Sequence, residues 1–228
     1  MRKILVLTML FALVLGLSFS VRSVQATPIL DFNMDAIHPV GVSLSYGGGA
    51  APLIGVKIGV DSVVGLTTPL HSGVAYSITD GELNFTTGAS TGNWVWGGPG
   101  TITVVGTVKD NGNTISSGNI FTGNFSSAMV ILDSLGKPTF KVAIGAFVDE
   151  KNELLLDWFG LPYGLGWYYE GGFNLSFNTT ANTGESFTAD PVLSGDIINT
   201  PIPEPATMLL LGSGLIGLAG FARKRFKK

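Results

Sequence analysis

The chain has 228 residues, no cysteine and a formal net charge of −3. The lack of cysteine excludes disulfides, thiol catalysis and thiolate metal sites. Residues 27–202 are more acidic than the whole chain, because five lysines face fifteen aspartates and glutamates there, for a net charge of −10. This balance argues against nucleic acid or anionic lipid as a partner of that region, since phosphate contacts need lysine and arginine.

The N-terminal residues 1–26 predict a secretory signal peptide. Arg2 and Lys3 form a basic head, residues 4–19 are uncharged and mostly apolar, and Val24-Gln25-Ala26 places small side chains where a signal peptidase acts. We expect cleavage after Ala26. The alternative is an uncleaved anchor helix, which the shortness of the apolar stretch disfavours.

Residues 27–198 are predicted to fold as a single antiparallel domain of the β-sandwich or jelly-roll type. Apolar residues alternate with polar or small ones in "LIGVKIGV" (53–60), "KVAIGAFVD" (141–149) and "GFNLSFN" (172–178). This period of two is typical of half-buried strands, and no interior stretch has a persuasive helical period. Short strands joined by polar turns therefore favour an all-β class.

Two turn signals stand out within this region. Asp80-Gly81 separates "VAYSIT" from "ELNFTT" and predicts a two-residue hairpin turn. The segment "TITVVGTVKDNGNTISSG" (101–118) predicts a strand, a turn at Asp-Asn-Gly-Asn and a returning strand.

The aromatic residues are the most informative feature of the domain. Alternation places Trp94 and Trp96 on one strand face with Val95 opposite, so the two indoles form a candidate sugar-binding platform. A second cluster comprises Trp158-Phe159 and Trp167-Tyr168-Tyr169. Exposed rings stack on the apolar faces of sugars, but large aromatic side chains also fill the cores of β domains. At both clusters we favour core packing.

Other candidate sites are weaker. Asp31, Asn33 and Asp35 alternate like the start of a calcium loop, but Ala36 and Val42 occupy the positions where an EF-hand needs glycine and glutamate. A looser calcium site stays open, and no other cofactor is expected.

Catalytic motifs find little support. Ser90 lies in "GASTG", a pattern that works only at a turn from strand into helix, whereas strand and turn residues follow here. His38 and His71 are isolated, and neither has a second histidine at metal-binding spacing.

Residues 199–228 combine three unlike elements. Three prolines between residues 201 and 205 predict an extended stalk. The uncharged apolar run of residues 208–221 follows; as a helix it would span roughly 21 Å, short of the ~30 Å hydrocarbon layer. The basic cluster Arg223, Lys224 and Arg225 predicts a stop signal on the cytoplasmic side. A marginal membrane span followed by a strong stop-transfer signal suits a transient membrane anchor.

The order of these elements resembles the PEP-CTERM sorting signal, in which Pro203-Glu204-Pro205 would be the namesake motif. The resemblance implies an exosortase as partner, a membrane protease-transpeptidase that removes the tail near this motif. It also implies a Gram-negative host that makes exopolysaccharide. The protein would be held transiently in the inner membrane by its C-terminal helix and then reach the cell surface or the extracellular matrix of a biofilm.

We therefore expect an exported, non-enzymatic surface or matrix protein associated with exopolysaccharide. Two alternatives stay open. One is a carbohydrate-binding module of defined specificity that uses exposed aromatic residues, with or without calcium. The other is a secreted hydrolase, which for glycosides would need two carboxylates about 5–10 Å apart.

Overall fold

The computed structural model describes residues 26–34, 43–132, 139–165, 167–189 and 192–203. The fold is all-β, as the sequence predicts, with 68% strand and 4% helix. Within the described residues the elements are β1 (Ile29–Met34), β2 (Ser43–Tyr46), β3 (Leu53–Gly59), β4 (Ser62–Leu66), β5 (Ala75–Thr86), β6 (Ser90–Gly92), β7 (Val95–Asp110), β8 (Asn113–Leu132), β9 (Thr139–Lys151), α2 (Glu153–Trp158), β10 (Trp167–Asn178), β11 (Phe187–Ala189) and β12 (Val192–Pro203).

The strands form a closed, eight-stranded antiparallel barrel with extra strands, which corrects the predicted sandwich or jelly roll. The order β5-β4-β1-β12-β10-β9-β8-β7 returns to β5, because β5 pairs with β4 and also with β7. β3, β2 and β11 continue from the second half of β5, and β6 adds to β7. Inward and outward residues alternate in a barrel as they do in a sandwich, so the pattern predicted the strands but not the closure.

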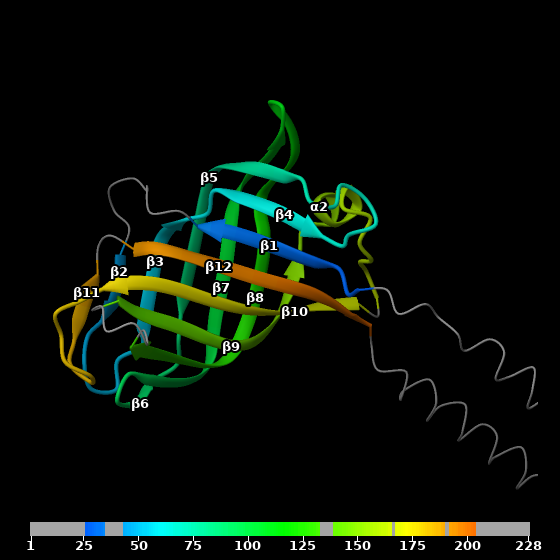
Figure 1. Ribbon diagram of the computed structural model, residues 1–228. Helices are drawn as coiled ribbons and strands as arrows, with labels where there is room; N and C mark the ends of the chain where they lie inside the picture. Colours follow the sequence, from blue (N-terminus) through cyan, green and yellow to red (C-terminus); the bar gives the residue numbers. More distant parts are fainter. Residues whose placement is uncertain (1–25, 35–42, 133–138, 166, 190–191, 204–228) are drawn as a thin grey trace, which may run out of the picture.

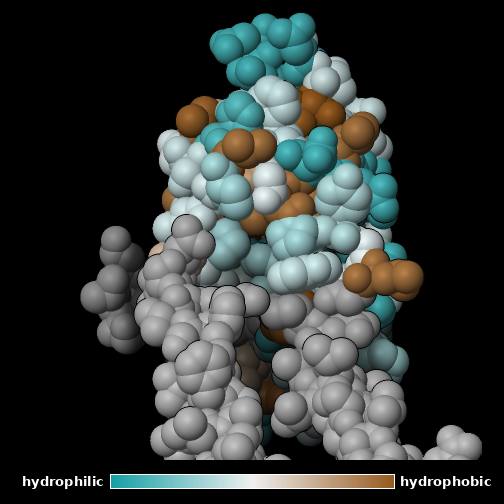
Figure 2. All heavy atoms as spheres, turned by 90° about the vertical axis from the view of Figure 1, so that its right-hand side faces the viewer, coloured by the Kyte–Doolittle hydropathy of each residue, from teal (hydrophilic) through white to brown (hydrophobic). Residues whose placement is uncertain are grey.

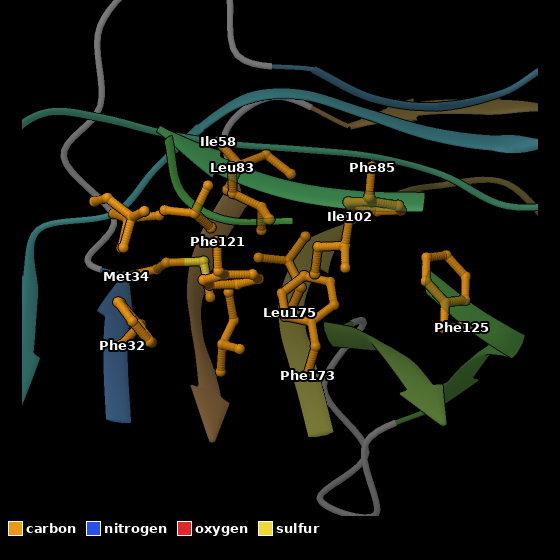
Figure 3. Packing of buried hydrophobic residues seen from close by; sticks show 14 of the residues in the cluster. Phe32, Met34, Ile58, Leu83, Phe85, Ile102, Phe121, Phe125, Phe173 and Leu175 are labelled. Carbon is orange, nitrogen blue, oxygen red and sulfur yellow. The ribbon is translucent and has the colours of Figure 1, made fainter. Parts of the chain in front are cut away.

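The core lies between strands that cross steeply in Figure 1, where β1, β12 and β10 run over β7 and β8. The rings of Phe32 (β1) and Phe121 (β8) are 5.3 Å apart, and those of Phe85 (β5) and Phe173 (β10) are 5.5 Å apart. Figure 3 shows these side chains directed into one shared interior together with Leu175. Opposite walls of the barrel are therefore in direct contact, and the interior is packed.

The Asp80-Gly81 hairpin prediction is wrong, because β5 runs through both residues. The pairing of β5 with β7 shifts register between Thr79 and Glu82, so the dipeptide forms a bulge. Asp80 has a φ of 53°, and a Cβ on Gly81 would lie 2.0 Å from the carbonyl oxygen of Val60. The dipeptide therefore bends a continuous strand instead of forming a turn between two strands. The hairpin between β7 and β8, by contrast, is confirmed at Asp110 and Asn113.

Both ends of the domain emerge on one side, at the right of Figure 1. β1 and β12 are antiparallel neighbours, with Leu30 opposite Asn199. The segment from Asn199 to Pro203, predicted as a stalk, is instead the last part of β12 and pairs with β10. Asn199 is fully buried. The folded domain therefore extends to Pro203, five residues beyond the predicted boundary at residue 198.

Candidate functional site

An open cavity of about 510 Å³, the end cavity, lies at the end of the barrel where α2 sits. One continuous stretch of chain supplies its lining, from the end of β9 through α2 to the start of β10. The lining residues are Asp149, Glu150, Lys151, Glu153, Leu156, Tyr163, Gly164, Leu165, Trp167, Tyr168 and Tyr169.

The helix α2 is fixed at this place by its first residues. The Asn152 side chain accepts hydrogen bonds from the backbone N–H groups of Leu154 and Leu155, which caps the helix. Leu155 and Leu156 are buried against the barrel, whereas Leu154 is 64% exposed. No helical period predicted α2, because a helix of six residues is too short to repeat its apolar face.

A buried ion pair lies beneath the end cavity. The Lys151 Nζ atom is 2.5 Å from Oδ1 of Asp149, and both side chains are 0% exposed. Asn199 donates from Nδ2 to Oδ2 of Asp149 at 2.6 Å. Lys151 as a whole residue is 9% exposed, so only its main chain reaches the surface. The charged groups are thus sealed off from whatever occupies the end cavity.

Aromatic rings surround the Lys151 ammonium group. Its Nζ atom lies 4.6 Å from the ring centroid of Phe121, 5.0 Å from that of Tyr169 and 5.9 Å from that of Phe32. The negative faces of such rings attract a cation in place of water. Tyr169 is itself anchored, because its hydroxyl donates to the carbonyl oxygen of Pro162 at 2.7 Å.

Burial dominates the titration of this cluster. Burial lowers the pKa of Lys151 to about 8, although the attraction of Asp149 opposes the change. Burial also raises the pKa of Asp149, against the opposing effect of Lys151. The pKa of Tyr169 is raised by burial and by the Asp149 charge. Perturbed groups often mark functional sites, but a pair with no exposed side-chain atom acts on packing rather than on substrate.

The lining of the end cavity includes four exposed apolar or aromatic residues, which we call the rim: Tyr163, Leu165, Trp167 and Tyr168. Trp167 and Tyr168 are 38% and 37% exposed, and Leu165 is fully exposed. Figure 2 views this end of the fold, where brown apolar residues lie among pale and teal ones. The expectation of core packing thus holds for Tyr169 but not for its two predecessors.

The candidate platform of Trp94 and Trp96 is not a surface in this structure. The two residues are 1% and 0% exposed, and Val95 between them is exposed. The Trp94 indole N–H donates to the carbonyl oxygen of Glu185 at 2.8 Å, and that of Trp96 to the carbonyl oxygen of Ala51 at 3.1 Å. The predicted strand begins one residue later than expected, because Trp94 lies in the turn before β7 with a φ of 57°. Both rings nevertheless lie in the core, so neither is exposed for stacking on a sugar.

The calcium hypothesis gains no support from the described residues. Asp31 and Asn33 share a shallow outer pocket with Asp196 and Asn174, and Asn174 donates to Asp196 at 2.6 Å. Burial, and then Asp196, raises the pKa of Asp31. Asp35 lies outside the described residues, and no group of three or more histidines or carboxylates that could hold a metal occurs within them.

The catalytic motifs take structural positions. Ser90 lies in β6 and donates to the carbonyl oxygen of Val95 at 3.3 Å, with no helix following. The His71 ring stacks on Trp158, with centroids 4.3 Å apart. His38 lies outside the described residues.

Comparison with protein families decides the nature of the C-terminus. The family described as the PEP-CTERM protein-sorting motif matches residues 201–225. The chain carries a PEP-CTERM sorting motif. The PEP-CTERM motif indicates a secreted protein that an exosortase processes, of the kind found in Gram-negative bacteria. No curated protein and no solved structure matches the chain.

The PEP-CTERM motif begins inside the folded domain. Pro201 is buried and Pro203 is the last residue of β12. The other predicted sorting residues, Glu204 with Pro205 and the basic Arg223-Lys224-Arg225, lie outside the described residues.

The predicted signal-peptidase site is accessible where the structure describes it, because Ala26 is exposed and precedes β1. Within the described part of the chain, no helix has the length and apolar character needed to cross a membrane. The predicted spans at residues 4–19 and 208–221 lie outside that part.

Sequence reasoning noticed the residues of the end cavity but did not join them into a site. Trp167, Tyr168 and Tyr169 form part of the second aromatic cluster of the sequence, whereas the acidic residues at positions 149, 150 and 153 carry no motif. About fifteen residues separate these two groups in the sequence. The helix α2 and the loop after it bring both groups to the same cavity. One signal for this site is present in the sequence: a Gly-rich, aromatic stretch joins two alternating strands. Such a stretch indicates a long connecting segment rather than a tight turn, and long connections often carry binding residues.

Proposed function

We propose that this PEP-CTERM protein is a non-enzymatic component of the bacterial surface or extracellular matrix, and that it binds exopolysaccharide at the end cavity. The observation that carries the proposal is the rim. Two consecutive aromatic residues of β10, Trp167 and Tyr168, line a cavity large enough for one or two sugar units, and each is more than one third exposed.

Sugar stacking fits the chemistry of this end of the fold. Tyrosine and tryptophan present apolar faces for sugar C–H groups and polar atoms for hydroxyl groups. Glu150 and Glu153 are exposed in the lining and supply acceptors for hydroxyl hydrogens. Such contacts do not depend on basic residues, which are scarce in the domain. Weak binding at each site would be multiplied by many copies within a matrix.

The hydrolase alternative has less support. Asp149, a cavity-lining carboxylate with a raised pKa, is bound through both oxygens to Lys151 and Asn199. A general acid must reach the substrate oxygen that it protonates. The Asp149 side chain has no exposed surface, so it is not placed for that role.

Replacing both Trp167 and Tyr168 by alanine is expected to lower retention of the protein on exopolysaccharide purified from the host by about tenfold, because two stacking contacts are lost. The melting temperature should fall less than when a fully buried ring is removed, since more than one third of each side chain already meets water. Affinity electrophoresis and thermal unfolding provide the two measurements. Met129→Ala, an exposed apolar residue on β8, is the matched control. Unchanged retention in the double variant would contradict glycan binding at the rim.

The mature protein is expected to begin at Thr27 and to lack residues 208–228. Ala26 is exposed, and the sorting motif overlaps only the last residues of β12 before continuing into the tail. Intact mass of the protein recovered from a host with an exosortase provides the measurement. The same host without its exosortase gene is the control and should yield the chain with its C-terminus. A mature mass that retains residues 208–228 in the intact host would contradict removal of the tail.

A further inference from the structure

The rim and the sorting motif lie at the same place in the fold. Trp167 pairs with Pro203 and Tyr168 with Ile202, so the first rim residues of β10 are hydrogen-bonded neighbours of the last residues of β12. Because β12 continues to Pro203, no flexible stalk separates the end cavity from the start of the C-terminal tail.

The length of the connecting chain limits how far the rim can lie from a membrane. Four residues, 204–207, separate Pro203 from the apolar run that begins at Met208. Fully extended, this connection reaches about 17 Å. If the apolar run enters a bilayer, the end of β12 and the rim beside it are held within that distance of the lipid surface.

The acidity of the domain disfavours electrostatic attraction to anionic lipid, so a membrane contact must rest on apolar and aromatic side chains. The rim has this composition, and none of its residues is charged. Leu165 is 105% exposed, and with the 45% exposed Tyr163 it extends the apolar area that Trp167 and Tyr168 begin. Tryptophan and tyrosine favour the boundary between headgroups and acyl chains, and leucine favours its apolar side. Leu165 has no packing function in the fold, because no part of its side chain is buried.

We infer that, before its tail is removed, the protein rests with the rim on the outer surface of the inner membrane, so that the bilayer covers the end cavity. Removal of the tail then releases the rim and opens the cavity. Processing would thereby activate the binding surface as well as free the protein, and premature capture of polysaccharide at the membrane would be avoided. The membrane contact rests on the exported, tail-bearing protein and does not depend on glycan binding, whereas the activation of the cavity rests on the proposed function.

The absence of cysteine permits a direct test with single labels. In the full chain, Leu165→Cys reports on the rim. Met129→Cys is the matched control: Met129 is 42% exposed and pairs with Val95, on the far part of the barrel. Each variant carries a thiol-linked fluorophore and is reconstituted into phosphatidylcholine vesicles containing a lipid with a nitroxide headgroup. No polysaccharide is present.

We expect quenching at position 165 to exceed that at position 129 by at least threefold, and to fall to the level of position 129 when the tail is cut at a protease site inserted after Ala206. Equal quenching at both positions would overturn the inference, as would failure of the full chain to float with the vesicles. Quenching at position 165 that requires co-reconstituted exosortase would also overturn it, because the rim would then contact the enzyme rather than lipid. Each outcome is independent of retention on exopolysaccharide, so a failure here is distinguishable from a failure of the proposed function.

Discussion

Replacing either Trp94 or Trp96 by alanine is expected to destabilise the domain by about 3–5 kcal/mol. Each indole is almost fully buried, so its removal leaves a cavity that the surrounding residues fill only in part. The Trp96 ring packs edge-on against Tyr46 with centroids 5.1 Å apart, and the Trp94 ring against Phe187 at 5.2 Å. Each substitution also leaves a backbone carbonyl, of Ala51 or Glu185, without its indole donor.

For a domain of this size, such a loss lowers the melting temperature by about 10 °C or more. Thermal unfolding followed by circular dichroism provides the measurement, and Trp167→Ala is the matched control, since the same ring is removed from a partly exposed position. The control should lower the melting temperature by clearly less than either core variant, because more than one third of the Trp167 side chain already meets water. If Trp94→Ala unfolded like this control and lost retention on exopolysaccharide, the two indoles would be a binding platform after all.

Replacing Asp149 by alanine is expected to destabilise the domain by about 3–5 kcal/mol, because the Lys151 ammonium group would be left buried without a counter-charge. The side chain of Lys151 has no exposed surface through which water could replace the carboxylate. Asn199 would also lose the acceptor of its side-chain N–H. Urea unfolding, which reports the free energy of unfolding directly, is the suitable measurement.

The double variant Asp149→Leu with Lys151→Met is the control for this prediction. Removing both charges and keeping apolar volume is expected to restore stability to that of the natural chain or above it, because the desolvation cost of the pair disappears. A single Asp149→Ala substitution that costs less than about 1 kcal/mol would show that Lys151 is neutral or hydrated in the folded protein.

The pH dependence of stability follows from the same pair. The pKa of Lys151 is about 8 in the folded protein and 10.5 at its ordinary value, so between these limits the unfolded chain binds a proton that the folded chain lacks. Stability therefore rises with pH in this window. The natural chain should gain stability relative to the double variant between about pH 8 and pH 10. A difference that falls with pH in this range would contradict the lowered pKa of Lys151.

Much of the protein is readable from its sequence alone. The order of prolines, apolar run and basic residues after position 200 was sufficient for the sorting motif, because a membrane-entry signal acts as a linear string and needs no fold. Alternation likewise predicted the strands at residues 53–60 and 172–178, because successive side chains of any strand point to opposite faces of its sheet. The burial of Trp94 and Trp96 was favoured on a different ground, because large aromatic side chains fill the cores of β domains.

The tertiary structure decided which strands meet and which face is inside. In β9, apolar residues at even positions predicted an outward Asp149, yet Asp149 and Lys151 lie inside the barrel. On the neighbouring β8, Phe125 and Ala128 are both buried although three residues apart, and they pair with residues 147 and 144. The inward phase thus changes midway along the strand, a local event that strict alternation does not encode.

The choice of partners was also decided only in three dimensions. Asp149 and Lys151 are two residues apart, but Asn199 reaches them because β12 is the neighbour of β10 in the closed sheet. The rim adjoins the sorting motif for the same reason, with Trp167 opposite Pro203. Period two specifies a face for each side chain but not the neighbour of each strand, because every antiparallel pairing satisfies the same backbone hydrogen bonds. Closure of the barrel, set by the packing of its interior, selects one arrangement among them.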